Sequence, residues 1–349
     1  MEAAKIMRTK WLKPLRKSNF VTFGSPLIDL VINVTDTFLE KFDLNHNDAV
    51  ALQNDNVLFE EVEKLMPKYV IGGCALNTAR ALKKVLENGT CTVVGAVGDD
   101  DYCKYIKNQL DEDTVGWVFV TLPTNTGRCA VLVNGNHRSL CTDLGASKYF
   151  TVENLQSEEI WKVVQNAHYF YLPGFFLSVS VECVTILAQH TFQKFFSLNL
   201  SAPFIVERYK DQILDLLPYV DILFGNETEV KSLAKALGWE YKDLSEMLLR
   251  INALNVRSKS RVTVITRGPK SVLMAHDNNV AEFLVEELEQ DKIKDTNGAG
   301  DAFVGGFLAN FIMGKSLGTC VLGGIDIARR AIQHNGCLFG SNALAEWKF

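Results

Sequence analysis

Short runs of consecutive apolar residues alternate along the chain with stretches in which apolar residues recur at helical spacing. The strand-like runs lie at 93–97, 169–172, 196–200, 222–224 and 262–265, and the helical patterns lie at 79–86, 102–110, 183–192 and 205–217. Strands that are apolar throughout and separated by helices are typical of a mainly parallel sheet with helices on both faces. The sequence therefore predicts an α/β fold.

Two stretches of the chain depart from this alternation. Residues 29–52 combine alternating β-type positions with a short helical piece, and residues 117–144 have the pattern of three strands joined by turns. Hairpins inside an α/β chain indicate a small sheet that stands apart from the main one and is suited to a lid. The predicted parts are a basic arm (1–18), a large α/β domain (19–28, 56–112 and 147–349) and a small discontinuous lid domain (29–55 and 113–146).

Composition excludes several classes of protein without naming a function. The chain has 349 residues, with 36 Lys and Arg against 41 Asp and Glu, so its net charge is −5. An acidic chain has no general attraction for nucleic acid or anionic lipid. The most apolar stretch, 168–188, is interrupted by proline, glycine and glutamate and does not predict a membrane span. We therefore expect small-molecule ligands, with neither nucleic acid nor membrane as a partner.

Cysteines and the N-terminus bear on the compartment. The eight cysteines are scattered and include no Cys-x-x-Cys pair, which is untypical of a disulfide framework. The first 17 residues carry six Lys and Arg but lack the apolar stretch of a signal peptide. We interpret them as a solvated arm, with weak targeting or phosphate contact as the alternative. The expected location is cytoplasmic, and presence in the nucleus stays open.

The most informative segment is Asp-Thr-Asn-Gly-Ala-Gly-Asp at 295–301, which leads into an apolar helix predicted from Phe303 to about Met313. Glycines before a helix allow several N–H groups to converge, and the helix N-terminus adds positive potential. The N–H groups of 297–300 therefore predict an anion hole, and Asp301 beside it could hold an attacking hydroxyl. A simple capped helix start is the alternative.

Two other phosphate-binding patterns do not apply to this region. The glycine spacing is not that of a dinucleotide fingerprint, whose third glycine would fall at Phe303. Residues 309–316 resemble a loosened P-loop, but they continue the predicted helix, and Gly314 is placed as its C-terminal stop. Lys315 is therefore expected on the surface rather than on a phosphate.

A second glycine-rich segment lies at 72–80. Gly72 and Gly73 precede a predicted helix and would let a ligand approach backbone N–H groups, while Asn77 could reach hydroxyl groups from the first turn. On its own, this pattern is equally typical of a plain loop-to-helix junction.

Together these segments resemble the paired motifs, Gly-Gly-x-x-x-Asn and Asp-Thr-x-Gly-Ala-Gly-Asp, of the ribokinase-like (phosphofructokinase B type) carbohydrate and nucleoside kinases. Residues 226–229 resemble the Asn-x-x-Glu motif of this family, and the similarity runs from about residue 20 to about residue 340. Runs at 24–29, 174–177, 198–204 and 219–229 are most similar to the members that act on adenosine. The resemblance implies transfer of the γ-phosphoryl group of ATP to the 5′-hydroxyl of adenosine, giving AMP and ADP.

The resemblance also implies roles at the phosphate site. Asp301 would orient the 5′-hydroxyl and accept its proton late, and the positive helix N-terminus is expected to keep this carboxylate ionised and a weak base. Arg138 on the lid hairpin would approach the transferred phosphoryl group, with a solvated hairpin charge as the alternative. The implied catalytic residues are Asp301, Arg138, Gly298, Ala299 and Gly300. The implied ATP contacts are Asn199, Asn226, Thr266, Arg267, Gly268, Asn297, Gly298, Gly300 and Asn335, with Mg²⁺ at Asn226 and Glu229 through water.

For the nucleoside, the resemblance implies a pocket with one polar side and one apolar side. Asp29 could accept both vicinal hydroxyls of a ribose, and Phe176 and Phe204 would stack on the adenine or enclose it. A strand-end cap for Asp29 and plain core packing for the apolar residues are the alternatives. The full set is Ser25, Leu27, Asp29, Gly72, Gly73, Cys74, Asn77, Cys129, Leu140, Leu144, Phe176, Phe204 and Asn297. Ser25 stands where many family members carry Asn, which puts the substrate range in question.

Two other functions are compatible with the sequence. A related kinase could act on a different nucleoside or a sugar, although the apolar and aromatic residues argue against a bare sugar. A catalytically silent paralogue could bind adenosine or nucleotide, although the intact Asp301, Gly298 and Gly300 argue against it. The resemblance further implies a monomer.

Overall fold

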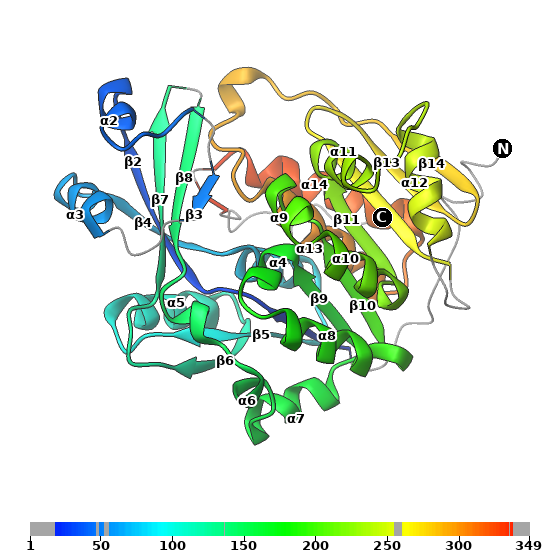
Figure 1. Cartoon of the computed structure of the whole chain (residues 1–349), viewed down its shortest axis with the longest axis horizontal. Helices are drawn as coiled ribbons and strands as arrows, with labels where there is room; N and C mark the ends of the chain where they lie inside the picture. Colours follow the sequence, from blue (N-terminus) through cyan, green and yellow to red (C-terminus); the bar gives the residue numbers. More distant parts are fainter. Residues whose placement is uncertain are drawn as a thin grey trace.

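The computed structural model describes residues 18–46, 49–51, 56–135, 137–254, 260–334 and 336–337. The basic residues of the N-terminal arm, and Asn335 of the predicted ATP site, lie outside the described residues. Within them, a small sheet stands to one side of a larger one that is covered by helices (Figure 1). None of the helices in these ranges is both long enough and apolar enough to cross a membrane.

The large sheet has nine strands in the order β14-β13-β12-β11-β10-β9-β1-β5-β6. Neighbouring strands from β12 to β6 are parallel, and the two pairs that include β13 are antiparallel. The strands are β1 (Asn19–Phe23), β5 (Thr90–Val97), β6 (Gly116–Thr121), β9 (Tyr169–Pro173), β10 (Phe195–Asn199), β11 (Ile222–Asn226), β12 (Val262–Arg267), β13 (Lys270–His276) and β14 (Asn279–Phe283). The predicted mainly parallel α/β sheet is thus confirmed.

Helices cover both faces of this sheet, and alternate residues of each strand serve the two faces. Phe20 and Tyr171 belong to the core under one set of helices, whereas Val21 and Phe170 belong to the core under the other. The first set is α4 (Cys74–Val85), α5 (Asp101–Glu112), α13 (Ala299–Ile312) and α14 (Leu317–Ala331). The second is α6 (Val152–Leu155), α7 (Glu158–Asn166), α8 (Val181–His190), α9 (Pro203–Arg208), α10 (Lys210–Leu216), α11 (Glu227–Ala236) and α12 (Leu244–Ala253).

The small sheet has the strand order β3-β8-β7-β2-β4. Along the chain, helix α2 (Asp36–Lys41) lies between β2 and β3, and helix α3 (Asn56–Lys64) lies between β3 and β4. Its strands are β2 (Leu27–Asn33), β3 (Ala49–Ala51), β4 (Lys68–Gly72), β7 (Gly127–Asn134) and β8 (His137–Asp143). Two strands differ from the predicted division: β6, assigned to the lid, pairs with β5 in the large sheet, and β4, assigned to the large domain, pairs with β2. The hydrophobic pattern identified β6 as a strand but carried no information on its pairing partner, and it did not identify β4.

Two predicted helices have different bounds in the structure. The helix predicted at 205–217 is two helices, because Tyr209, with φ −113° and ψ 29°, interrupts the helical backbone between α9 and α10. Helix α13 begins at Ala299, four residues before the predicted start, and ends as expected: Gly314 has φ +70° and its N–H bonds to the carbonyl of Phe311. Lys315 is exposed, so the P-loop-like run is the end of a helix, as predicted.

Close packing between α13 and α4 brings the two glycine-rich motifs together. A Cβ on Gly305 of α13 would lie 2.5 Å from Cβ of Ala81 in α4, and one on Gly306 would lie 2.6 Å from the carbonyl oxygen of Gly323 in α14. Such distances are below any normal contact, so only glycine allows these helices to approach so closely. The approach aligns the N-termini of α4 and α13 at one end of the large sheet.

Candidate active site

The turn before α13 has the shape expected of an anion-binding loop. Gly298 lies in the left-handed region (φ +73°), where a Cβ would also meet Cβ of Cys337 at 2.8 Å. The Asp295 carboxylate accepts hydrogen bonds of 3.0 Å from the N–H groups of Asn297 and Gly336, which holds the turn. At Gly300, no described atom outside its own helix backbone and chain neighbours lies within 4 Å of the position a Cβ would take. The turn therefore leaves open space at the N-terminus of a fourteen-residue helix.

Asp301 lies in the first turn of α13 and is buried, with 8% of its surface exposed. Its Oδ2 accepts a 3.0 Å hydrogen bond from Nδ2 of Asn77, so the last residue of one motif pairs directly with the last residue of the other. Burial raises the pKa of Asp301 to about 7, and hydrogen bonds from Asn77 and the Cys74 thiol offset only part of that effect. The expectation that the helix N-terminus keeps this carboxylate ionised and a weak base was wrong, because burial raises its pKa.

Asp29 in β2 is a second carboxyl group in this region. A Cβ on Gly72 would lie 2.1 Å from its Oδ1, so the glycine leaves the room that this carboxylate occupies. Burial raises the pKa of Asp29 to about 7, with further contributions from the charges of Asp295 and Asp301. The carboxylate is therefore within electrostatic reach of the α13 turn, and it is not merely a strand-end cap.

Two buried polar atoms in this region have no partner among the described residues. Oδ1 of Asn77 is free, although its amide nitrogen bonds to Asp301, and Nδ2 of Asn297 is also unpaired. Buried polar groups in folded proteins are nearly always hydrogen-bonded. The two motifs thus offer one unpaired acceptor and one unpaired donor. A bound ligand could satisfy them with a hydroxyl group and a phosphate group.

One face of the small sheet gathers most of the predicted nucleoside residues. In the β2–β7–β8 register, Asp29 pairs with Cys129, Cys129 with Thr142, and Leu27 with Gly127. Because side chains alternate along strands, the predicted residues Leu27, Asp29, Cys129, Leu140 and Arg138 share this face. Leu144, just beyond β8, is half-buried beside Gly127. The opposite face, which includes Ile28 and Leu30, is fully buried against α3 and α5.

The loop between β1 and β2 meets the loop before α4. Gly73 has φ +94°, and a Cβ there would lie 2.3 Å from the carbonyl oxygen of Ser25. Cys74 is half-buried directly after it. The structure thus brings Ser25, Gly72, Gly73 and Cys74 together with Asp29, as the predicted pocket requires.

Arg138 connects the small sheet to the α13 turn. Its Nε lies 3.7 Å from Oδ1 of Asp295, and its Nη2 donates a 3.1 Å hydrogen bond to the carbonyl of Lys294. The side chain is 19% exposed. It is therefore not a solvated hairpin charge: the arginine reaches across to the residues that precede the anion-binding turn.

The two predicted aromatic residues have different environments. Phe204 is 42% exposed, as a wall residue would be, but Phe176 is 2% exposed and packs on Phe23 and Phe150 with ring centroids 6.1 and 5.8 Å away. The prediction for Phe176 was wrong, because its ring faces the core. Its half-buried neighbour Phe175 instead faces Phe204, with centroids 6.0 Å apart. The Phe-Phe pair in the sequence gave no signal of which ring turns outward.

Among the described residues, the predicted ATP contacts that are not in the α13 turn lie at or just beyond the carboxyl ends of three neighbouring parallel strands. Asn199 ends β10, Asn226 ends β11, and Asn226 pairs in register with Thr266 near the end of β12. Gly268 follows with φ +61° and open space around it. The Arg267 guanidinium is held by Ser271 and by Glu282, 2.6 Å from its Oε1, so it already has protein partners. Carboxyl ends of parallel strands are the usual ligand edge of such sheets.

The Asn-x-x-Glu segment begins α11 as a capping box. Oε2 and Oε1 of Glu229 accept hydrogen bonds of 2.9 and 2.7 Å from the N–H and Nδ2 of Asn226, and the Glu229 N–H bonds back to Oδ1 of Asn226. Burial raises the pKa of Glu229 to about 7, and the charge of Asp301 adds to this. In the described ranges, no group of three or more His, Cys, Asp or Glu is arranged to hold a metal ion.

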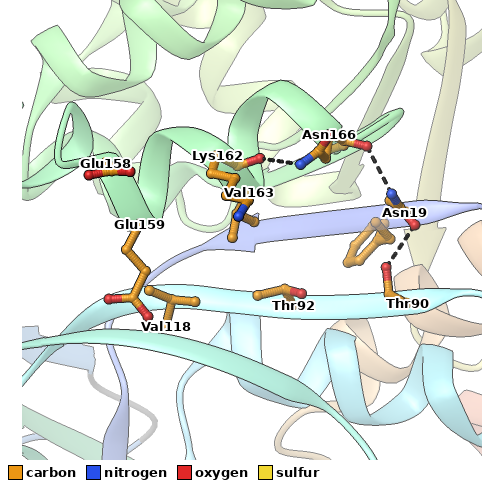
Figure 2. Close-up of a pocket in the computed structure, with 11 residues that line it drawn as sticks. Asn19, Thr90, Thr92, Val118, Glu158, Glu159, Lys162, Val163 and Asn166 are labelled. Atoms are coloured by element: carbon orange, nitrogen blue, oxygen red, sulfur yellow. Dashed lines mark hydrogen bonds between the residues drawn. The ribbon is translucent and has the colours of Figure 1, made fainter.

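A cavity of about 620 Å³ lies elsewhere, between α7 and strands β1, β5 and β6 (Figure 2). None of the predicted site residues lines it. Three of its polar residues pair with one another: Nδ2 of Asn19 donates to the Asn166 carbonyl at 3.0 Å, and the Thr90 hydroxyl donates to Oδ1 of Asn19 at 2.9 Å. We therefore place the site at the α13 turn and not in this cavity.

Comparison with known proteins agrees with this placement. Residues 36–343 match the model of the pfkB family of carbohydrate kinases. The chain belongs to that family. It is 36% identical over 327 residues to adenosine kinase 1 of Arabidopsis thaliana, covering 90% of this chain and 94% of that protein. It is 34% identical to the adenosine kinase of Schizosaccharomyces pombe, with 91% and 96% covered.

Solved structures show the same similarity for this pfkB family member. Anopheles gambiae adenosine kinase, in complex with P1,P4-di(adenosine-5) tetraphosphate, matches with a TM-score of 0.86 and 37% identity, covering 93% of this chain and 98% of that one. Adenosine kinase from Schistosoma mansoni, in complex with 2-fluoroadenosine, matches with a TM-score of 0.88 and 30% identity, covering 94% and 98%. The ribokinase-like fold inferred from the paired motifs is confirmed.

Proposed function

We propose that the protein transfers the γ-phosphoryl group of ATP to the 5′-hydroxyl of adenosine, giving AMP and ADP. The observation that carries this proposal is the pairing of Asp301 with Asn77 beside the open turn at Gly298–Gly300. This arrangement places a proton acceptor next to an anion-binding helix N-terminus, which is what phosphoryl transfer to an alcohol needs. The similar proteins named as adenosine kinases support adenosine as the acceptor.

In this proposal Asp301 orients the 5′-hydroxyl and accepts its proton. A carboxylate with a pKa near 7 is a better proton acceptor than an ordinary aspartate, and it is still largely ionised at slightly alkaline pH. The N–H groups of Asn297, Gly298, Ala299 and Gly300 would stabilise the charge on the transferred group. Arg138 would add a positive charge from the lid, because its Nε lies 3.7 Å from Oδ1 of Asp295 in the turn.

The nucleoside side follows from the face of the small sheet. Asp29 would accept the two vicinal ribose hydroxyls, with the free Oδ1 of Asn77 accepting a further donor. The rings of Phe175 and Phe204 would enclose the adenine, with Leu27, Cys129, Leu140 and Leu144 as apolar neighbours. Since an aromatic pair offers little to a bare sugar, these residues favour a nucleoside over a carbohydrate as substrate.

Kinases of this family use ATP with a divalent metal, and the residues present fit a limited role in holding it. Both carboxylate oxygens of Glu229 are engaged by Asn226, so direct ligation would break the capping box. We therefore propose that Asn226 and Glu229 contact Mg²⁺ through water, with the phosphates of ATP as its principal ligands. The ion would neutralise charge on the transferred phosphoryl group.

A substrate panel tests the proposal. ATP-dependent phosphorylation is measured with adenosine, inosine, guanosine, ribose and fructose 6-phosphate. We expect the kcat/KM for adenosine to exceed those for ribose and fructose 6-phosphate by at least about tenfold, because its base contacts the aromatic pair. Activity on a sugar without activity on adenosine would contradict the assignment of the pocket. Tight adenosine binding without turnover of any acceptor would instead indicate a silent binding protein.

A further inference from the structure

Tyr171 lies beneath the site and is absent from the motifs. It is in β9, fully buried, and its hydroxyl accepts a hydrogen bond of 3.5 Å from Nδ2 of Asn199 at the end of β10. Burial raises the pKa of the phenol well above its ordinary value, so the hydroxyl stays neutral and keeps its proton. The charge of Asp301 acts on it as well, which shows that the phenol lies near the reacting carboxylate.

The Asn199 amide has only one orientation open to it. Its Oδ1 accepts a 3.2 Å hydrogen bond from the N–H of Ser201, so its Nδ2 must point toward Tyr171. Ser201 has φ +69°, a conformation that non-glycine residues seldom adopt, and its hydroxyl accepts from the N–H of Gly174 at 2.8 Å. This chain of contacts leads from Tyr171 through Asn199 and Ser201 to the turn that carries Phe175.

The other side of the phenol faces α4. Helix α4 packs on β9, and the buried Thr78 hydroxyl, next to Asn77, interacts with the phenol by hydrogen bonding and has no other hydrogen-bond partner among the described residues. Thr78 therefore has acceptor capacity left for the Tyr171 O–H. The phenol stands between the helix that carries Asn77 and the strand end that carries Asn199.

We propose that Tyr171 is a positioning residue: its hydroxyl holds the Asn199 amide in place at the carboxyl end of β10, and so fixes the nucleotide side of the site. This inference rests on the proposed function, since Asn199 is a predicted ATP contact. Tyr171 itself is buried and would touch neither substrate. Its effect would appear in the kinetic constants for ATP rather than in those for adenosine.

Tyr171→Phe tests this with little change in shape, and the strand supplies a matched control. Tyr169 lies two residues away in β9, is 3% exposed, and its hydroxyl has no hydrogen-bond partner among the described residues. We expect Tyr171→Phe to lower kcat/KM for ATP about fivefold, the range of one neutral hydrogen bond, with KM for adenosine unchanged within twofold. Tyr169→Phe should leave both constants unchanged, and both variants should keep a Tm close to that of the wild type. Equal effects of the two substitutions would overturn the proposal.

A double-mutant cycle with Asn199→Ala shows whether Tyr171 acts through Asn199. We expect Tyr171→Phe to have no further effect on kcat/KM for ATP once the Asn199 amide is absent, because the two changes remove the same contact. Additive effects would show that Tyr171 acts by another route and would overturn the inference. The cycle remains informative if the single variant is less stable, since the comparison is made within each background.

The experiments separate a wrong positioning role for Tyr171 from a wrong proposed function. A wild-type protein that does not phosphorylate adenosine refutes the function, and the calorimetric Kd for ATP with Mg²⁺ then replaces the kinetic constant in the same cycle. A roughly fivefold weaker Kd for Tyr171→Phe, absent in Tyr169→Phe, would support the positioning role. An unchanged Kd would overturn it.

Discussion

The two halves of the proposed site are built in different ways. The phosphate side is a single turn of consecutive residues, 295–301, whose geometry follows from two glycines and one helix start. The nucleoside side is assembled from β2, β7 and β8 of the small sheet together with Phe175 and Phe204, which are far apart in sequence. The first half depends on backbone conformation and one carboxylate, and the second on which way each side chain faces. Mutations on the phosphate side should therefore lower kcat, and mutations on the nucleoside side should raise KM for adenosine.

Replacing the carboxylate should have the largest effect. We expect Asp301→Asn to lower kcat by about a thousandfold, because the amide cannot accept the hydroxyl proton, with adenosine binding largely kept. Single-turnover rates and a binding isotherm measure the two quantities separately. Asp326→Asn is the control, since Asp326 is a half-buried aspartate of α14 whose carboxylate pairs with Arg330 at 2.7 Å, away from the proposed site. Weakened binding with normal turnover would contradict the role given to Asp301.

The glycine turn should be the next most sensitive feature. Gly298→Ala places a Cβ 2.8 Å from Cβ of Cys337 at φ +73°, so the N–H groups of the turn must shift, and we expect kcat to fall about a hundredfold. Gly238 has a similar φ of +65° with open space around it. Gly238→Ala should cost about 1 kcal/mol of stability without loss of activity. Equal losses of activity in both would mean that strain, and not the shape of the turn, is responsible.

The neighbouring phenylalanines should separate binding from stability. Phe175→Ala removes a ring that faces Phe204, and we expect KM for adenosine to rise about tenfold with little change in unfolding free energy. Phe176→Ala leaves a cavity in the core and should cost about 3–5 kcal/mol. Steady-state kinetics and urea unfolding of both variants measure this. A raised KM with normal stability in Phe176→Ala would contradict the assignment of Phe176 to the core and of Phe175 to the proposed pocket.

These contrasts also show how far the sequence could lead. The contact between Asp301 and Asn77, 224 positions apart, was implicit in the paired motifs, because both motifs occur together in one family. The direction of the Phe175 and Phe176 rings was not, since two identical residues in a turn carry no period. The partner strands of β4 and of β6 could not be predicted either, because apolar alternation can identify a strand but does not identify the strand beside it. The Asp301 pKa depended on burial, which is set by the whole fold.

The same raised pKa predicts how stability depends on pH. Since Asp29, Asp301 and Glu229 all have folded pKa values near 7, above their ordinary values, the folded state binds more protons than the unfolded state between about pH 4 and 7. The free energy of unfolding should therefore fall as pH rises through that window. Asp301→Asn should flatten this dependence and stabilise the protein at pH 8 by on the order of 2 kcal/mol. Denaturant unfolding at pH 5 and pH 8 checks both statements.

In the proposed mechanism, a buried Asp301 with a raised pKa accepts the hydroxyl proton beside the α13 turn. The pH dependence of kcat/KM for adenosine, measured at saturating ATP and Mg²⁺, tests it most directly. We predict that the logarithm of kcat/KM rises with a slope near one below pH 7 and levels off above it, as the Asp301 carboxyl group ionises. A profile that is flat from pH 5 to 9, or that breaks near pH 4, would contradict the role of Asp301 as the proton acceptor.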